Sequence, residues 1–335
     1  MRELYEAVKQ ELTRIDFNAI WTGFTPIPFA LVGSDQVYLD GREIPLGDRF
    51  WANTVIMHED EMVATWCVDK PSEEDVQMLA ANLVHEMFHA FQSTQKRERN
   101  SGGGDEFTLL SYPDDLAAYR IKAAEANLLA RAYIDSDITA LTQFISLRKS
   151  RAQLLGDIIS CEYWAEDGEG MAEFAGLCAL EQLSTDKFEK YVTEMHLQML
   201  INPAEKLFSV RFMAYFTGSV LCLALKRLGI DFCHVLTDPC PLFEAISGTD
   251  GIADDFNKYY SAKKAKFDDF LAGSNNVIEK SGTITGMDPM NMWRMGDQIL
   301  CARFISIDGE NIPGPVMLNM AKGSGNQIVG IVKSN

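Results

Sequence analysis

The sequence predicts an α+β fold with a mostly antiparallel N-terminal sheet, a large helical lobe and a small C-terminal β region. Between residues 26 and 68, short apolar segments alternate with Gly, Asp and Pro turns, as strands and hairpins do. From residue 72 to about 275, long segments carry apolar residues at helical spacing. After residue 282 the pattern returns to short strand-like runs between Gly and Pro.

Composition limits the organisation and the partners of the chain. Its 335 residues are 47% hydrophobic, so it can bury a large core. We expect a main unit of residues 1–275 and a small β appendage of residues 276–335. The net charge of −18 argues against nucleic acid and anionic membranes as main partners. The composition does not indicate an oligomeric state.

The N-terminus and the cysteines predict a cytoplasmic protein. Residues 1–8 are charged and amphipathic and lack the apolar segment of a secretory signal. No apolar run approaches the roughly 18 residues that a membrane span needs. The seven cysteines are odd in number, irregularly spaced and without a Cys-x-x-Cys pair, which indicates reduced core residues.

The first 70 residues predict a helix followed by a sheet. Residues 3–15 form an amphipathic pattern, and the candidate strands are residues 29–32, 36–39, 51–57 and 62–68. The last two strands are joined by His58-Glu59-Asp60-Glu61 and predict a hairpin. An edge of such a sheet can bind an extended peptide by strand addition.

A helix over residues 72–96 carries the clearest chemical signal. Ser72 can cap it, and the acidic residues that follow favour its positive end. It contains His85-Glu86-Met87-Phe88-His89, so the two histidines lie about 40° apart around the axis and about 6 Å apart along it. Both imidazoles can reach one metal ion, and Glu86 is placed as a base beside a water on that ion.

The rest of the chain predicts a helical lobe over residues 113–275 and then strands. The helical segments are residues 113–133, 137–155, 158–183, 186–200, 205–229 and 252–272, with Gly168 and Gly170 interrupting the third. The C-terminal strands are residues 299–307, 315–320 and 328–332. They either complete the N-terminal sheet or bind a partner. His196 is interpreted as a half-buried structural residue.

A hydrolytic zinc site needs a third protein ligand, and carboxylates are the best candidates in this chain. Four of them lie on one face of the helix over residues 158–183: Glu162, Glu166, Glu169 and Glu173. The pattern alone does not decide which of the four is the ligand. The competing interpretation is an acidic stripe that faces solvent.

The segment Glu169-Gly170-Met171-Ala172-Glu173, preceded by Trp164, resembles the Glu-Gly-x-Ala helix of gluzincin metallopeptidases, the thermolysin and aminopeptidase-N types. The resemblance implies a zincin-like fold with Glu169 as the third zinc ligand. It also implies that Glu173 holds a ligand histidine in place, a contact that fixes the imidazole tautomer.

A second segment, Tyr215-Phe216-Thr217-Gly218, resembles the Tyr-x-x-Gly helix of aminopeptidase-N-type enzymes. The resemblance implies that the Tyr215 hydroxyl stabilises an oxyanion. Arg211, one turn earlier, binds a substrate carboxylate or pairs with the acidic residues. Asn82, one turn before His85, either hydrogen-bonds near the site or serves the helix and core. No Gly-x-Met-Glu-Asn segment, which binds the substrate amine in the aminopeptidases, precedes residue 85, so endo and exo cleavage both stay open.

These features together predict a zinc metallopeptidase, a hydrolase acting on a peptide or protein substrate with Glu86 as general base. Zinc is inferred from the ligand types. The alternative is a non-catalytic zinc-binding or protein-interaction module on a gluzincin-like scaffold. A third interpretation is a helical structural protein in which the motif is accidental.

Overall fold

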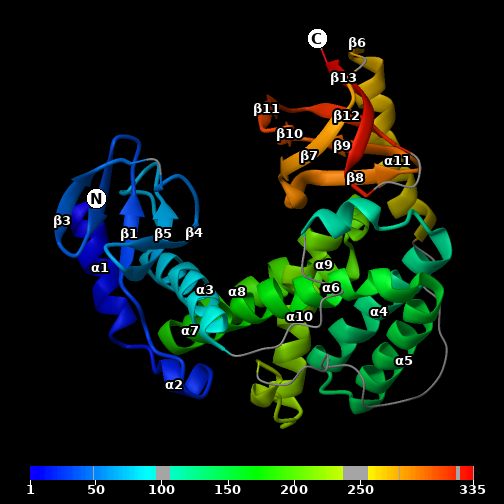
Figure 1. Ribbon diagram of the computed structural model, residues 1–335. Helices are drawn as coiled ribbons and strands as arrows, with labels where there is room; N and C mark the ends of the chain where they lie inside the picture. Colours follow the sequence, from blue (N-terminus) through cyan, green and yellow to red (C-terminus); the bar gives the residue numbers. More distant parts are fainter. Residues whose placement is uncertain (48, 96–105, 237–255, 279, 322–324, 335) are drawn as a thin grey trace.

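The computed structural model is α+β, as the sequence predicts (Figure 1). It describes residues 1–47, 49–95, 106–236, 256–278, 280–321 and 325–334. An N-terminal lobe holds the first sheet, a group of helices forms the middle of the molecule, and a second sheet lies beyond the helices. Among the described residues, no helix is both long and apolar enough to cross a membrane.

The N-terminal lobe is a five-stranded sheet with the order β3-β2-β1-β5-β4. All neighbours are antiparallel except β1 and β5, so the mostly antiparallel prediction is confirmed. Strand β3 was not predicted; its alternation is short and largely exposed. The elements are α1 (Arg2–Leu12), α2 (Phe17–Ile20), β1 (Phe29–Val32), β2 (Gln36–Leu39), β3 (Arg42–Pro45), β4 (Thr54–His58) and β5 (Glu61–Cys67).

Strands β4 and β5 form the predicted hairpin, with Thr54 opposite Thr65 and His58 opposite Glu61. Glu59 and Asp60 both adopt positive φ angles, 47° and 68°, which give the tight turn its reversal. Strand β4 begins at Thr54 rather than at residue 51. It lies at the edge of the sheet, and β5 is its only neighbour among the described strands.

Helix α3 (Val76–Thr94) packs between this sheet and the central helices. Its cap is Asp75, whose carboxylate accepts hydrogen bonds from the amides of Gln77 and Met78. The predicted cap at Ser72 is therefore wrong, because the chain enters the helix one turn later. The predicted end at residue 96 lies outside the described residues. Leu79, Leu83 and Met87 are buried and fix the helix in the core.

The middle of the molecule is helical, as predicted. Its elements are η1 (Glu106–Ser111), α4 (Leu116–Ile134), α5 (Ile138–Leu155), η2 (Gly156–Ile159), α6 (Ser160–Ala165), η3 (Glu166–Gly170), α7 (Met171–Leu183), α8 (Thr185–Tyr191), η4 (Val192–Leu197), α9 (Gln198–Ile201), η5 (Ala204–Phe208), α10 (Val210–Arg227), η6 (Cys233–Leu236) and α11 (Phe256–Ala272). The α-helix is interrupted at Gly168 and Gly170, as predicted, but the chain stays helical there and widens into the π-helical turn η3.

The C-terminal strands form a separate eight-stranded sheet, so the alternative that they complete the N-terminal sheet is wrong. They are β6 (Ser274–Ile278), β7 (Gly282–Met287), β8 (Met292–Met295), β9 (Gln298–Cys301), β10 (Phe304–Ile307), β11 (Glu310–Pro313), β12 (Val316–Met320) and β13 (Gln327–Ser334), with η7 (Pro289–Asn291) before β8. The predicted strand 299–307 divides into β9 and β10. Trp293 and Met317 share a core with Tyr119, Phe208 and Phe267, which joins this sheet to the helices.

Candidate metal site

Three predicted ligands meet in one place. His85 and His89 project from α3, and their Nε2 atoms lie 3.1 Å apart. Oε2 of Glu169, on the π-helical turn η3, lies 3.5 Å from Nε2 of His85 and 3.4 Å from Nε2 of His89. The three donor atoms can all lie within 4.8 Å of one another. Two imidazole nitrogens and one carboxylate oxygen are a donor set that can hold a metal ion.

Glu162 and Glu166 are occupied elsewhere, and so are not candidates for the third ligand. Each makes a two-pronged ion pair with a buried arginine of α5, Glu162 with Arg151 and Glu166 with Arg148. Thr217 of α10 also donates to Glu166. The acidic face is therefore buried against cations, and the interpretation as a solvent-facing stripe is wrong. The pair of Glu162 anchors α6, and the pair of Glu166 anchors η3, the turn that carries the candidate ligand.

Glu173 lies one turn beyond Glu169 and orients His85. Its Oε2 lies 3.0 Å from Nδ1 of His85, which leaves the Nε2 face of that imidazole toward the cluster. Burial lowers the pKa of His85, but hydrogen bonds to Glu169 and Glu173 outweigh it and raise the pKa to about 10. Burial alone would raise the pKa of Glu173, yet its two histidine partners hold it well below its usual range. Without a metal ion, the imidazole of His85 is therefore protonated on both nitrogens and positively charged at neutral pH.

Gln92 is a site residue that the sequence interpretation missed. Its Oε1 lies 3.0 Å from Nδ1 of His89, so it orients the second imidazole. Its amide nitrogen donates to the carbonyls of Asp167 and Gly168, at 2.9 and 3.1 Å. Gln92 thus ties α3 to η3 at the cluster. The available signal was its position three residues after His89, on the same helix face.

Glycines at two helix crossings explain how the ligands come together. A Cβ on Gly170 would overlap the Cα of Gly218, so η3 and α10 meet there backbone to backbone. A Cβ on Gly176 would lie 2.9 Å from the carbonyl oxygen of Ala81, at the crossing of α7 and α3. The first approach brings α10 beside Glu169, and the second brings α3 beside α7.

Replacing Gly170 by Ala should reduce stability by about 1–3 kcal/mol and weaken metal binding, because the new methyl group meets backbone that cannot rotate away. Gly168→Ala, two residues earlier in the same turn, is the matched control. Its Cβ would meet nothing within 4 Å, so its stability should stay the same or rise by up to about 1 kcal/mol. Urea unfolding and metal titration of both variants measure this; equal behaviour of the two would contradict the role of the crossing.

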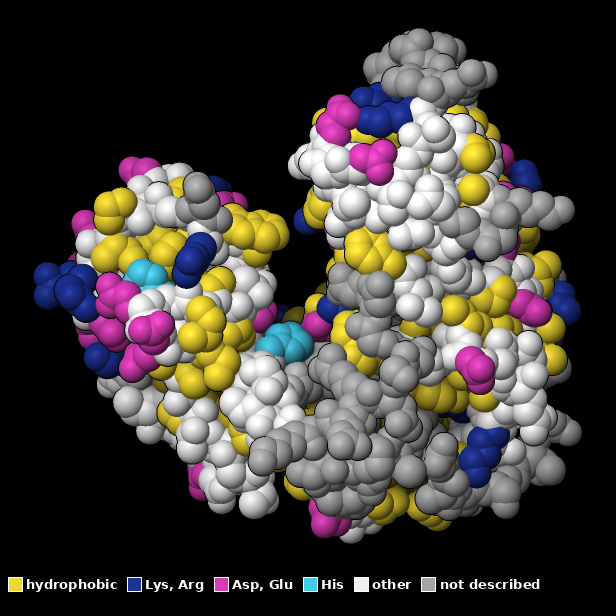
Figure 2. All heavy atoms as spheres, viewed as in Figure 1, with side chains coloured by type: hydrophobic (Ala, Val, Ile, Leu, Met, Phe, Trp, Pro, Cys, Tyr) yellow, Lys and Arg dark blue, Asp and Glu magenta, His cyan; other side chains and the backbone are white. Residues whose placement is uncertain are grey.

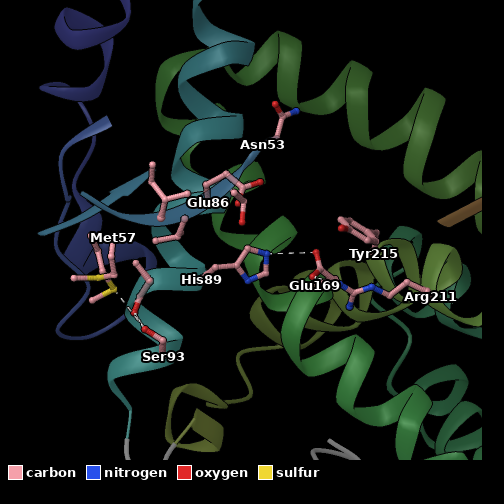
Figure 3. A pocket seen from close by; sticks show the side chains of 13 residues that line it. Asn53, Met57, Glu86, His89, Ser93, Glu169, Arg211 and Tyr215 are labelled. Carbon is pink, nitrogen blue, oxygen red and sulfur yellow. Dashed lines mark hydrogen bonds and ion pairs between the residues drawn. The ribbon is translucent and has the colours of Figure 1, made fainter. Parts of the chain in front are cut away.

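The cluster opens into a cavity of about 520 Å³ (Figure 3). Residues 53–57, from β4 and the segment before it, form one wall, and α3 and α10 supply Glu86 and Tyr215. In the space-filling view the surface is deeply hollowed between the N-terminal lobe and the remainder, with a histidine at the base of the hollow (Figure 2). A molecule in this cavity can contact His89 and Glu169, two of the three candidate ligands.

Glu86 and Tyr215 have the environments that a base and an oxyanion donor need. Burial raises the pKa of Glu86, although His85 and His89 lower it, so its carboxylate is a stronger base than a surface glutamate. Burial also raises the pKa of Tyr215, and the charge of Glu169 raises it further, so the hydroxyl keeps its proton. The Tyr215 ring stacks on His85 with centroids 5.7 Å apart.

Arg211 pairs with an acidic residue, which is one of its two alternatives, and Asn82 lies beside the cluster. Arg211 donates to Oε1 of Glu169 at 2.5 Å, so it pairs with the acidic group while also lining the cavity. Asn82 lies beside His85 and Glu173 at a small cavity behind the cluster. Among the described residues, no hydrogen bond joins Asn82 to either of them.

Comparison of the chain with protein-family models, with curated proteins and with solved structures found no match.

Metal binding should strengthen as the pH rises. Below about pH 10 both nitrogens of His85 are protonated in the metal-free site, and a metal ion must displace the proton on Nε2. The apparent affinity for zinc should thus rise about tenfold per pH unit between pH 7 and pH 9. Calorimetry in two buffers of different ionisation enthalpy measures the released proton, and an affinity that does not change with pH would contradict this protonation state.

Proposed function

We propose that this protein is a zinc-dependent peptide hydrolase. The observation that carries the proposal is the convergence of His85, His89 and Glu169 at the edge of one cavity. His89 and Glu169 line that cavity together with Glu86 and Tyr215. A site that only held a metal would need neither a buried carboxylate with a raised pKa nor a protonated tyrosine at the same opening. Two imidazoles and one carboxylate favour zinc, with coordination positions left open.

Each side chain has a distinct task in this proposal. A zinc ion on His85, His89 and Glu169 would supply a Lewis acid that polarises a carbonyl and makes a water more acidic. Glu86 accepts the proton of the attacking water and passes it to the leaving amine. The Tyr215 hydroxyl donates to the oxygen that gains negative charge. Arg211 holds Oε1 of Glu169, so that Oε2 faces the two histidines.

The wall of the cavity favours an extended peptide as the substrate. Strand β4 lines it, and the described part of the sheet pairs β4 with β5 alone. This edge offers backbone N–H and C=O groups that a peptide strand can bind, in competition with Arg49 at the Met57 carbonyl. Met57, on this strand, is 53% exposed and can contact a substrate side chain.

We also propose a reducing, cytoplasmic location. The described cysteines are all unpaired. Cys67 and Cys233 are partly buried, and four are fully buried: Cys161, Cys178, Cys222 and Cys301. Such thiols are typical of proteins from a reducing compartment. Mass measurement of alkylated protein taken directly from cells tests this, since disulfides would contradict it.

The experiment that tests the function is cleavage of a defined peptide mixture by the zinc-loaded protein, read by mass spectrometry. We expect new termini at preferred sequences, their loss on adding a zinc chelator and their return with zinc. Zinc uptake with no cleavage by protein that binds the peptides would instead favour a non-catalytic zinc or interaction module.

A further inference from the structure

His196 lies behind the metal cluster and is fully buried, with 1% of its surface exposed. The expectation that this residue is only half-buried is therefore wrong. Its Nε2 lies 3.0 Å from Oε1 of Glu173, and the other oxygen of that carboxylate lies 3.0 Å from Nδ1 of His85. One carboxylate thus links His196 to a candidate metal ligand.

The fold directs His196 at Glu173 specifically. The residue lies in η4, a π-helical turn, and such turns are uncommon and often occur at functional sites. The ring is held between Tyr191 and Phe216, at centroid distances of 5.2 and 5.3 Å. Both the backbone and the packing therefore fix the direction in which Nε2 points.

The hydrogen bonding of His196 is also one-sided. Its Nδ1 is buried, and no described atom hydrogen-bonds to it. A carboxylate accepts hydrogen bonds, so the proton must be on Nε2, which donates to Glu173. A buried polar ring is costly unless its hydrogen bonds compensate for burial, and here that compensation comes through Glu173.

We propose that His196 is a positioning residue for the metal centre, an inference that rests on the proposed function. By donating to Oε1, it holds the Glu173 carboxylate so that Oε2 stays on Nδ1 of His85. That contact fixes the His85 tautomer with Nε2 directed at the metal. Without His196, Oε1 of Glu173 loses its partner and the carboxylate can turn away from His85.

The test compares two substitutions at the same position. Gln places its amide nitrogen near the position of Nε2 and can still donate to Glu173, whereas Leu fills similar space without a donor. We expect His196→Leu to weaken zinc affinity about 10–100-fold and His196→Gln to stay within about threefold of wild type. Zinc affinity is measured by competition with a chromophoric chelator, and the absorption bands of the Co²⁺-substituted proteins report changes at the metal itself.

A double-mutant cycle tests whether His196 acts through Glu173. In a Glu173→Ala background, His196→Leu should change zinc affinity no further. If the Leu variant does not fold, His196→Asn replaces it, because its shorter amide keeps polarity but does not reach Oε1.

The outcomes separate the two proposals. If the wild-type protein binds zinc and His196→Leu binds it with the same affinity, the positioning role is overturned and the proposed function is unaffected. If the Leu and Gln variants lose zinc affinity equally and in proportion to their loss of thermal stability, His196 only fills the core. That result also overturns the positioning role. A wild-type protein that takes up no zinc overturns both.

Discussion

Replacing Glu86 by Gln should leave zinc bound at the wild-type stoichiometry and reduce peptide cleavage about 10²–10⁴-fold. The amide fills the same space but cannot accept the proton of the attacking water. Glu86 is not among the three residues whose donor atoms converge, so metal binding should not depend on it. Steady-state cleavage rates and elemental analysis of the same samples measure both quantities.

The control for this substitution is Glu194→Gln, an exposed glutamate of η4. It makes the same chemical change away from the cavity and should keep the wild-type rate. Wild-type turnover by the Glu86 variant would remove the general base from the mechanism. Loss of zinc together with activity would mean that Glu86 supports the metal site instead.

Replacing Glu169 by Ala should reduce zinc affinity more than about 100-fold, since a ligand removal should exceed the effect of losing an orienting partner. Cleavage should be lost with the metal. Arg211 would lose its carboxylate partner but lies at the cavity, where water can solvate it. Zinc titration of the purified variant measures the affinity, and circular dichroism checks that it is folded.

Glu162→Gln is the comparison that decides between the carboxylates of this face. It disturbs a buried ion pair with Arg151 and should lower the free energy of unfolding, by an amount approaching the 3–5 kcal/mol typical of breaking such a pair. Zinc affinity of the folded variant should stay near wild type. If Glu169→Ala kept its zinc and Glu162→Gln lost it, the third ligand would be Glu162 and not Glu169.

Local periodicity was enough to predict that His85 and His89 converge at the candidate metal site. The i, i+4 spacing of His85 and His89 places both on one face of a helix whatever surrounds it. The same holds for the face that carries Glu169 and Glu173. Most strand positions were also predicted, because alternation and turn residues act over a few residues.

The missed features depend on partners distant in the chain. The spacing of Glu162 and Glu166 gives no sign that Arg151 and Arg148 face them from another helix. The sequence around His196 is typical of a core residue, and only the structure shows that η4 directs its ring at Glu173. Gly168 and Gly170 indicated an interruption of the helix, but not that Gly170 makes a close crossing with α10. Such contacts are set by tertiary packing rather than by local pattern.

We propose that one zinc ion on His85, His89 and Glu169 supports peptide hydrolysis. The most direct test removes metal with a chelator, adds zinc stepwise to the chain and follows bound zinc and peptide cleavage in the same samples. We expect both to rise together and to stop at about one equivalent of zinc per chain. No zinc uptake, or cleavage that does not depend on zinc, would contradict the proposed zinc-dependent hydrolysis.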